Sequence, residues 1–183
     1  MILPIFAYGQ PVLRKKAIDI EQGFSALDEL IANMWETMYN AKGVGLAAPQ
    51  IGKSVRLFLI DTTQIEEEKE EGIKQVFINA QMIKEEGDEV SFEEGCLSIP
   101  DIRGDIYRPS NISINYLDEN LEEHIKSFEG FNARVIQHEY DHIEGKLFTE
   151  KLMPLRKRMI KRKLEAIRKG NISVDYRMKF SLK

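Results

Sequence analysis

The stretch Phe131–Ile143 reads FNARVIQHEYDHI and is the part of the sequence that decides the fold. We predict a helix over these residues, because Gly145 follows at the position where glycine commonly ends a helix. His138 and His142 are four residues apart, so a helix places both imidazoles on one face, one turn apart. The sequence therefore predicts a helix that directs two histidines toward a common point.

The pattern His-Glu-x-x-His is typical of a metal site. Two imidazoles in this arrangement can hold one metal ion, and Glu139, beside the first histidine, can reach a water bound there. The chain has only three histidines and two of them lie here. With so few histidines, a chance match to the His-Glu-x-x-His pattern is rare. The alternative interpretation is a pair of histidines on a solvated helix face.

A catalytic zinc-type site usually has three protein ligands, so a third ligand is needed. One metallopeptidase pattern supplies a third histidine on the same segment, but Phe148 occupies that position here. A peptidase that uses a downstream glutamate, Glu150 or Glu165, stays open. Cys96 is the other candidate, since a thiolate is a good ligand for zinc or ferrous iron. A free cysteine is, however, more commonly a small buried core residue.

Further helix and strand patterns lie on both sides of this segment. Apolar residues at helical spacing predict helices over Ala26–Tyr39 and Leu155–Arg168. Strands are predicted at Val55–Ile60, Val76–Ile78, Gln81–Lys84, Ile112–Tyr116 and, from strict alternation, Ile172–Leu182. This mixture indicates an α+β fold: short, mostly antiparallel strands around the central motif helix, then a C-terminal helix and a final strand. That last strand can join the protein's own sheet or a partner's.

Length and composition predict one soluble domain. The 183 residues suit a single compact unit, in which we expect residues 1–150 to form the catalytic part and 151–183 to add the basic helix and terminal strand. No apolar run is long enough to cross a bilayer, and the first residues lack the features of a signal peptide. The single cysteine excludes an internal disulfide and suits a reducing cytosol. We therefore expect a cytoplasmic protein without a membrane partner.

A glycine-punctuated segment, residues 43–52, joins the first long helix to the next strand and reads GVGLAAPQIG. A phosphate-binding loop is excluded, because Ala47 stands where its first glycine should be and Pro49 has no N–H to offer a phosphate. Two interpretations stay open. The segment is either a tight connection or a loop that faces a substrate, where Gln50 offers an amide donor.

Three segments together resemble, in order, the motifs of the peptide deformylase family: GVGLAAPQ at 43–50, EGCLS at 94–98 and QHEYDH at 137–142. The opening GQPVLR at 9–14 is similar to that family's N-terminal segment. The resemblance covers roughly residues 4–150, and the ordered trio is far more specific than any single motif. It implies a metal-dependent hydrolase that removes the formyl group from N-formylmethionine at the start of newly made polypeptides and releases formate.

The resemblance also implies roles for the matching residues. The metal ligands would be Cys96, His138 and His142. The family's metal is typically ferrous iron, with zinc, nickel or cobalt as substitutes. Glu139 would be the general acid–base, while the amide of Gln50 and the backbone N–H of Leu97 would face the oxyanion.

Substrate binding would fall to Gly45, against the peptide backbone, and to Val44, Phe131, Arg134 and Val135, around the methionine side chain. Arg134 departs from an all-apolar wall, so only its aliphatic stem would pack there. Arg103 and Arg108 follow the second motif and would contact the peptide or pair with Glu94. The alternative for both arginines is a surface ion pair of little energetic value.

Basic residues crowd the segment Lys151–Lys169, where Glu165 is the only acid. A charge run of this kind is usually the solvated face of a docked helix. The resemblance to deformylases with a basic C-terminal helix implies instead a contact with ribosomal RNA, in addition to nascent formylmethionyl peptides as substrates. Contacts with phosphates would weaken steeply as salt rises.

Overall fold

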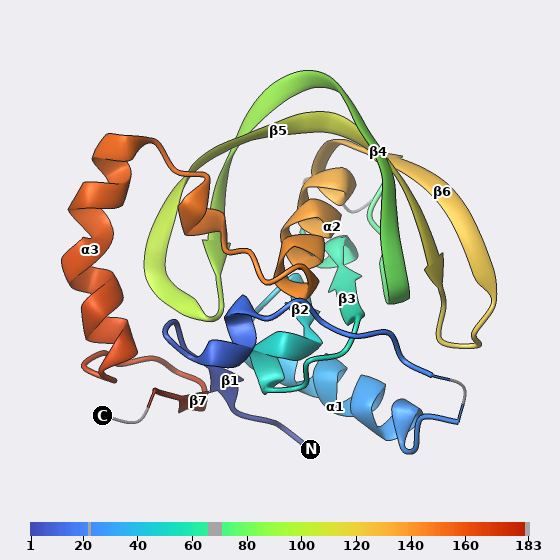
Figure 1. The fold of residues 1–183 in the computed structure, drawn as a ribbon, viewed down its shortest axis with the longest axis horizontal. Helices are drawn as coiled ribbons and strands as arrows, with labels where there is room; N and C mark the ends of the chain where they lie inside the picture. Colours follow the sequence, from blue (N-terminus) through green and yellow to red (C-terminus); the bar gives the residue numbers. More distant parts are fainter. Residues whose placement is uncertain (22, 66–70, 182–183) are drawn as a thin grey trace.

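The computed structural model describes residues 1–21, 23–65 and 71–181. Figure 1 shows a strongly curved sheet with helix α2 inside its curve, α1 near the N-terminus and α3 at one side. Among the described residues the main sheet is antiparallel and has the strand order β2-β3-β4-β5-β6, while β1 and β7 form a separate parallel pair. This arrangement confirms the α+β fold with the motif helix at its centre.

The three long helices lie where the sequence predicts them. They span Leu27–Asn40 (α1), Gly130–Ile143 (α2) and Pro154–Arg168 (α3). The buried residues Leu30, Met34 and Met38 recur every four positions along α1, which gives that helix its apolar face. Gly145 follows α2 with a φ of 71°, the left-handed conformation that ends many helices.

The main difference from the expected fold is the length of two strands. β4 (Lys74–Cys96) and β5 (Ile99–Leu117) have 23 and 19 residues and pair with each other through four register shifts. The sequence predicts shorter, separate strands in these regions. The middle of β4 is polar and exposed, so it carries no apolar alternation from which a strand can be recognised.

The remaining strands of the main sheet are β2 (Gly45–Ala47), β3 (Leu57–Asp61) and β6 (Glu123–Glu129). β3 overlaps the predicted buried strand Val55–Ile60, beginning two residues later and ending one residue later. β2 lies inside the glycine-punctuated segment, and a 3-10 helix, η2 (Ala48–Ile51), follows it directly. That segment is therefore an ordered strand and turn at the edge of the sheet.

Three apolar clusters hold these elements together. The first joins α2 to β3, β4 and β5 and includes stacked Phe58 and Phe77 rings, whose centroids are 4.7 Å apart. The second packs α1 against β2 and β3. The third joins β5 to α3 through Ile160 and Ile167. Because α2 is packed against several strands, its side chains have little freedom to move.

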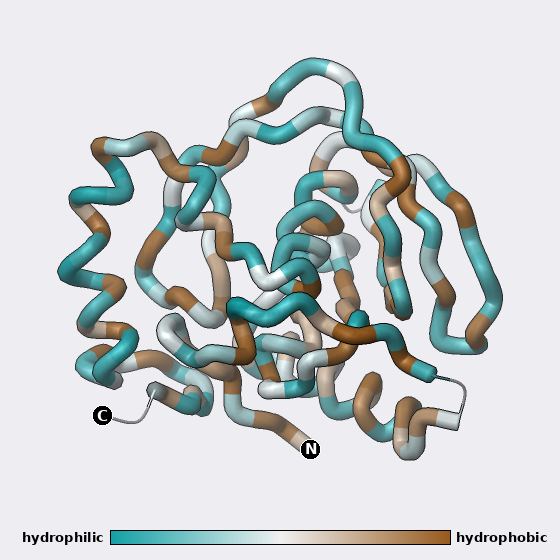
Figure 2. Tube along the Cα trace, viewed as in Figure 1, coloured by the Kyte–Doolittle hydropathy of each residue, from teal (hydrophilic) through white to brown (hydrophobic). Residues whose placement is uncertain are grey.

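α3 contacts the rest of the molecule through few of its residues. Ile160 and Ile167 are its buried residues, whereas Met159 is 63% exposed. Figure 2 shows α3 as mostly hydrophilic with isolated hydrophobic residues. No helix in the described part of the chain combines the length and apolarity needed to cross a membrane.

The last described segment returns from α3 to the N-terminal strand. Residues from Ile172 to Phe180 alternate between partly buried and exposed, as the sequence alternation predicts. Only Met178–Lys179 (β7) forms a strand, which pairs in parallel with Ile5–Phe6 (β1). The segment thus adds a short strand to the protein itself; Leu182, the predicted strand end, lies outside the described residues.

Candidate active site

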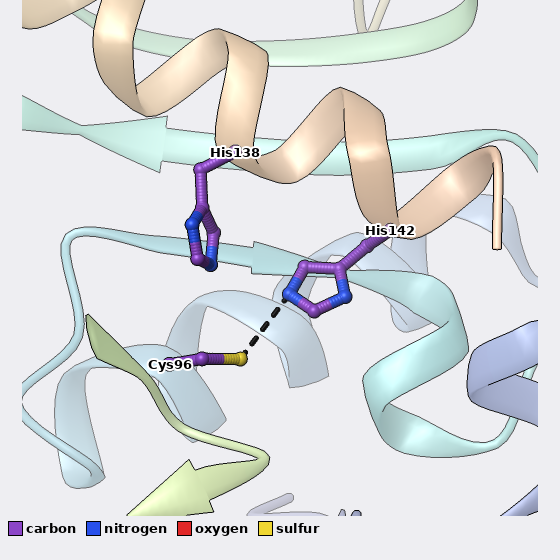
Figure 3. Close-up of side chains that lie close together, drawn as sticks. All are labelled: Cys96, His138 and His142. Atoms are coloured by element: carbon purple, nitrogen blue, oxygen red, sulfur yellow. Dashed lines mark hydrogen bonds between the residues drawn. The ribbon is translucent and has the colours of Figure 1, made fainter. Parts of the chain in front are cut away.

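Helix α2 and the hairpin between β4 and β5 bring three side chains together. His138 and His142 lie on one face of α2 with their ring centroids 5.1 Å apart, and Cys96 approaches them from the end of β4 (Figure 3). Sγ of Cys96 is 3.3 Å from Nε2 of His142. Potential ligand atoms of all three residues lie within 4.8 Å of one another. The tight turn at Leu97 and Ser98 is what carries Cys96 to the helix.

These three residues fit a metal ion. Ligand atoms at bond lengths of about 2.0–2.3 Å around a tetrahedral ion lie about 3–4 Å apart, which matches the distance from Sγ to Nε2. Nδ1 of His138 is 2.9 Å from a carboxylate oxygen of Glu94. Metal-binding histidines commonly have such a carboxylate partner on the other ring nitrogen. A thiolate with two imidazoles suits zinc or ferrous iron.

Glu94 is the centre of a buried charge network. Its carboxylate accepts hydrogen bonds from Arg108 at 2.7 and 3.0 Å and from Arg134 at 2.9 Å. Burial alone would raise the pKa of Glu94, but hydrogen bonds from His138 and Arg108 hold it well below its usual range. Arg108 also donates to Asp141 at 2.7 Å. Pairing of Arg108 with Glu94 is thus confirmed, and the pair is buried, which contradicts a surface ion pair for this arginine.

Glu139 lies on the turn of α2 that carries His138 and is only 4% exposed. Its Oε2 is buried and has no hydrogen-bond partner among the residues that the structure describes. Burial raises the pKa of its carboxyl group to about 7, a suitable value for proton transfer near neutral pH. Gly45 lies directly against this group, because a Cβ at that position would be 2.5 Å from Oε1. A larger residue at position 45 would therefore displace the carboxylate.

Gln50 and Leu97 lie next to the three candidate ligands. Gln50 is 1% exposed, and its Oε1 accepts the N–H of Ala47 at 2.8 Å. This bond fixes the amide so that Nε2 is 3.5 Å from Sγ of Cys96 and 3.3 Å from Oγ of Ser98. Leu97 follows Cys96 in the hairpin turn. The Gln50 amide therefore lies beside Cys96, and Leu97 is the next residue along the chain.

One cleft of about 670 Å³ runs past these groups. It is lined by all the residues expected to bind substrate: Val44, Gly45, Arg103, Phe131, Arg134 and Val135. The guanidinium of Arg134 is bonded to Glu94 and to the carbonyl of Ile106 at 3.0 Å. Arg103 pairs with Glu93 at 2.9 Å, with both side chains at least 60% exposed. An exposed pair of this kind adds little stability, which agrees with the interpretation of Arg103 as part of a surface ion pair.

Sequence reasoning missed two parts of this site. The first is the full network around Glu94, for which a signal exists: a metal-binding histidine usually needs a carboxylate partner, and Glu94 lies two residues before the candidate thiolate. The second is the C-terminal segment, whose residues 173–176 also line the cleft. No local sequence pattern predicts that these residues line the cleft, because this depends on the path that the chain takes after α3.

The downstream glutamates lie elsewhere. Glu150 accepts a hydrogen bond from Arg14 at 2.5 Å, and Glu165 accepts one from Arg168 at 2.6 Å. Neither residue belongs to a cluster of potential metal ligands within the described ranges. This placement contradicts a peptidase site in which a downstream glutamate is the third ligand.

The family model described as polypeptide deformylase matches residues 2–158. The chain belongs to this family. It is 57% identical to the peptide deformylase of Christiangramia forsetii, over 98% of this chain and 96% of the relative. It is 52% identical to the peptide deformylase of Cytophaga hutchinsonii over the full length of both chains. The crystal structure of a peptide deformylase from Legionella pneumophila covers 93% of this chain and 98% of its own, with a TM-score of 0.82 and 37% identity.

Membership of the deformylase family settles the class of reaction. The chain is an enzyme, a hydrolase that removes the N-formyl group from nascent peptides. Deformylases are metal-dependent, and the cluster of Cys96, His138 and His142 is a site at which this chain can hold a metal ion.

Proposed function

We propose that Cys96, His138 and His142 hold one divalent metal ion and that Glu139 is the general acid–base of deformylation. The observation that carries this proposal is the convergence of three ligand atoms within 4.8 Å of one another, beside a buried carboxylate. A divalent ion at this position supplies Lewis-acid activation of water near neutral pH.

Glu139 moves the protons of the reaction. Its carboxylate accepts a proton from the water that attacks the formyl carbon, and then delivers it to the methionine nitrogen as the C–N bond breaks. The products are formate and a free N-terminal amine. The pKa of about 7 allows the group to serve in both steps.

Gln50 and Leu97 stabilise the charge that builds on the formyl oxygen. Nε2 of Gln50 and the backbone N–H of Leu97 donate hydrogen bonds to that oxygen as it becomes negative. The bond between Gln50 and Ala47 holds the amide in place before substrate arrives. Loss of one such donor commonly costs about 10²–10³ in rate.

The cleft binds the start of the peptide. Gly45 contacts the substrate backbone, where its missing side chain leaves room beside Glu139. Val44, Phe131, Arg134 and Val135 surround the methionine side chain. The guanidinium of Arg134 bonds to Glu94, so its stem is the part that packs against methionine. Arg103, at the exposed side of the cleft, contacts the following part of the peptide.

The decisive experiment measures formate release from a formylmethionyl peptide under anaerobic conditions, with and without a chelator. We expect release that stops with chelator and returns when a divalent metal is added. The control is a peptide without an N-formyl group, in which only internal peptide bonds could be cut, and it should stay intact. Turnover that persists after the protein is shown to be metal-free would contradict the proposal.

The ligand set is tested by metal analysis of purified variants. Cys96→Ala and His142→Ala should each lose the metal, because a three-ligand site does not survive removal of one ligand. Ser127→Ala is the control, since Ser127 lies on β6 and belongs to neither group of potential metal ligands in the described part of the chain. Unchanged metal content in Cys96→Ala would restore the role of a plain core cysteine.

We propose ferrous iron as the native metal, by the family's usage and because thiolate and imidazole ligands suit it. Zinc, nickel and cobalt are the alternatives. Metal analysis of protein purified without oxygen, followed by reconstitution of the apoprotein with each ion, separates them. Higher activity with zinc than with iron, and zinc in the anaerobic preparation, would overturn the assignment.

We further propose that residues 1–150 and 151–183 form one domain, that the protein is cytoplasmic, and that α3 contacts ribosomal RNA. The third apolar cluster joins α3 to β5, which supports a single domain.

The single cysteine supports a cytoplasmic location. Six basic residues on α3 are exposed, which supports the contact with ribosomal RNA: Arg156, Lys157, Arg158, Lys161, Arg162 and Lys163. Fractionation of cells and co-sedimentation with ribosomes at several salt concentrations test the location and the RNA contact.

A further inference from the structure

The C-terminal segment 171–180 crosses from α3 to the N-terminal strand and is anchored at both ends. Near its start, Gly170 lies under the ring of Phe180. Near its end, the carbonyl of Arg177 accepts the N–H of Ile5 at 2.8 Å, and the carbonyl of Phe180 accepts Nε2 of Gln10 at 2.6 Å. Because both ends of the segment are anchored, its middle residues, 173–176, have a defined position.

The middle of this segment lies at the active site. Residues 173–176 line the same cleft as Cys96 and Glu139. The family model ends at residue 158, so these residues lie beyond the part of the chain that it matches. They belong to the active site of this chain by position, although they are far from its motifs in sequence.

Tyr176 makes the most specific of these contacts. Its hydroxyl donates a hydrogen bond to the backbone carbonyl of Leu97 at 2.8 Å. Leu97 and Ser98 form the turn between β4 and β5, and the carbonyl of Ser98 accepts the N–H of Tyr8 at 2.9 Å. Both carbonyls of the turn are therefore held by the region where the N-terminal strand and the C-terminal segment meet.

The side chain of Leu97 is confined as well. A Cβ on Gly43 would be 2.7 Å from Cδ1 of Leu97, which shows how closely this side chain packs on the glycine-punctuated segment. With Tyr176 on its carbonyl, Leu97 is held from two directions. Its N–H is the group assigned above to the formyl oxygen, and donors of this kind act through a fixed direction that costs no reorganisation during the reaction.

We propose that Tyr176 is a positioning residue for deformylation, which acts through Leu97 by fixing the turn that presents the Leu97 N–H. The inference rests on the proposed role of that N–H. It assigns to the C-terminal segment a part in catalysis, in addition to its part in the fold. The Leu97 N–H interacts most strongly with the formyl oxygen when that oxygen is negatively charged. Because Tyr176 holds this N–H in place, its contribution is larger in the transition state than in the bound substrate.

The test is Tyr176→Phe, which removes one hydroxyl and keeps the ring. We expect kcat to fall about twofold to tenfold, the equivalent of one hydrogen bond to a partly buried acceptor, with KM nearly unchanged. Metal content should equal that of the parent, and Tm should fall no further than in the control variant, which also loses one tyrosine hydrogen bond. Tyr39→Phe is the matched control: it removes a hydroxyl bonded to Asp61 at 2.6 Å, on a side chain that does not line the cleft.

The outcomes separate this inference from the proposed function. Equal kcat in Tyr176→Phe and Tyr39→Phe would overturn the role of Tyr176. So would a loss of kcat that accompanies a loss of metal, or a Tm well below that of Tyr39→Phe. Gln50→Ala, measured in parallel, tests the other oxyanion donor. If Gln50→Ala retains full activity while Tyr176→Phe is slow with normal KM, the oxyanion assignment of Gln50 fails and the positioning role of Tyr176 stands.

Discussion

Helices α2 and α3 have 14 and 15 residues, yet they relate to solvent in opposite ways. Nine residues of α2 are buried, and five of these are polar or charged: Arg134, Gln137, Glu139, Asp141 and His142. On α3 only Ile160 and Ile167 are buried. Both helices are rich in polar residues in the sequence, so polarity alone does not tell which helix is central. What differs is that four of these five side chains have hydrogen-bond partners on other elements, the exception being Glu139.

The partners of the α2 side chains come from β4 and β5. Glu94 on β4 and Arg108 on β5 bind to groups on α2 at 2.7–2.9 Å. Burying charges is costly unless each is paired and hydrogen-bonded. Through Glu94, this network also holds the ring of His138 in one direction. On α3 the charged groups remain in water and need no such partners.

The contrast between α2 and α3 should be largest in enzymatic activity. Glu139→Gln on α2 should lower kcat by about 10²–10⁴-fold, because the amide cannot carry the proton from water to the leaving amine. Metal content should be unchanged, since the three ligands remain. Glu165→Gln makes the same chemical change on α3, and formate release should equal that of the parent. Full activity of Glu139→Gln would remove this residue from the mechanism.

The second prediction concerns stability. Arg108→Ala leaves Glu94 and Asp141 with buried carboxylates that have lost a partner, so the free energy of unfolding should fall by about 3–5 kcal/mol. Arg158→Ala on α3 removes an exposed guanidinium and should change it by less than about 0.5 kcal/mol. Urea denaturation of both variants measures the difference. Similar values for the two would show that the buried network contributes no more than a surface charge.

The same contrast explains what could be predicted from the sequence. The helices and the histidine pair are local patterns, so the sequence predicts each helix to within one residue of its bounds. It predicts the long ribbon of β4 and β5 only in pieces, because the exposed middle of β4 lacks apolar alternation. The contact of Tyr176 with Leu97 joins residues 79 positions apart and depends on the whole path of the chain. Such long-range contacts leave no local trace.

A smaller effect tests whether α3 unfolds together with α2. Ile136→Val on α2 and Ile160→Val on α3 each remove one methylene group from a residue that is at most 3% exposed. If both helices belong to one cooperative domain, each variant should lose about 0.5–1.5 kcal/mol of unfolding free energy. Equilibrium unfolding followed by two probes measures this. A loss confined to Ile136→Val would mean that α3 separates before the domain unfolds, against the single-domain proposal.

The smallest expected effect on catalysis comes from the charges of α3. The triple variant Arg158→Ala, Lys161→Ala and Arg162→Ala alters only exposed side chains, so formate release from a short peptide should match the parent. Its co-sedimentation with ribosomes should weaken, and the salt dependence of binding should become shallower, because fewer phosphate contacts release fewer counterions. Binding of the parent that does not respond to salt would contradict an RNA contact through this helix. Equal binding of parent and variant would leave these charges as a solvated face, the counterpart of the buried charges on α2.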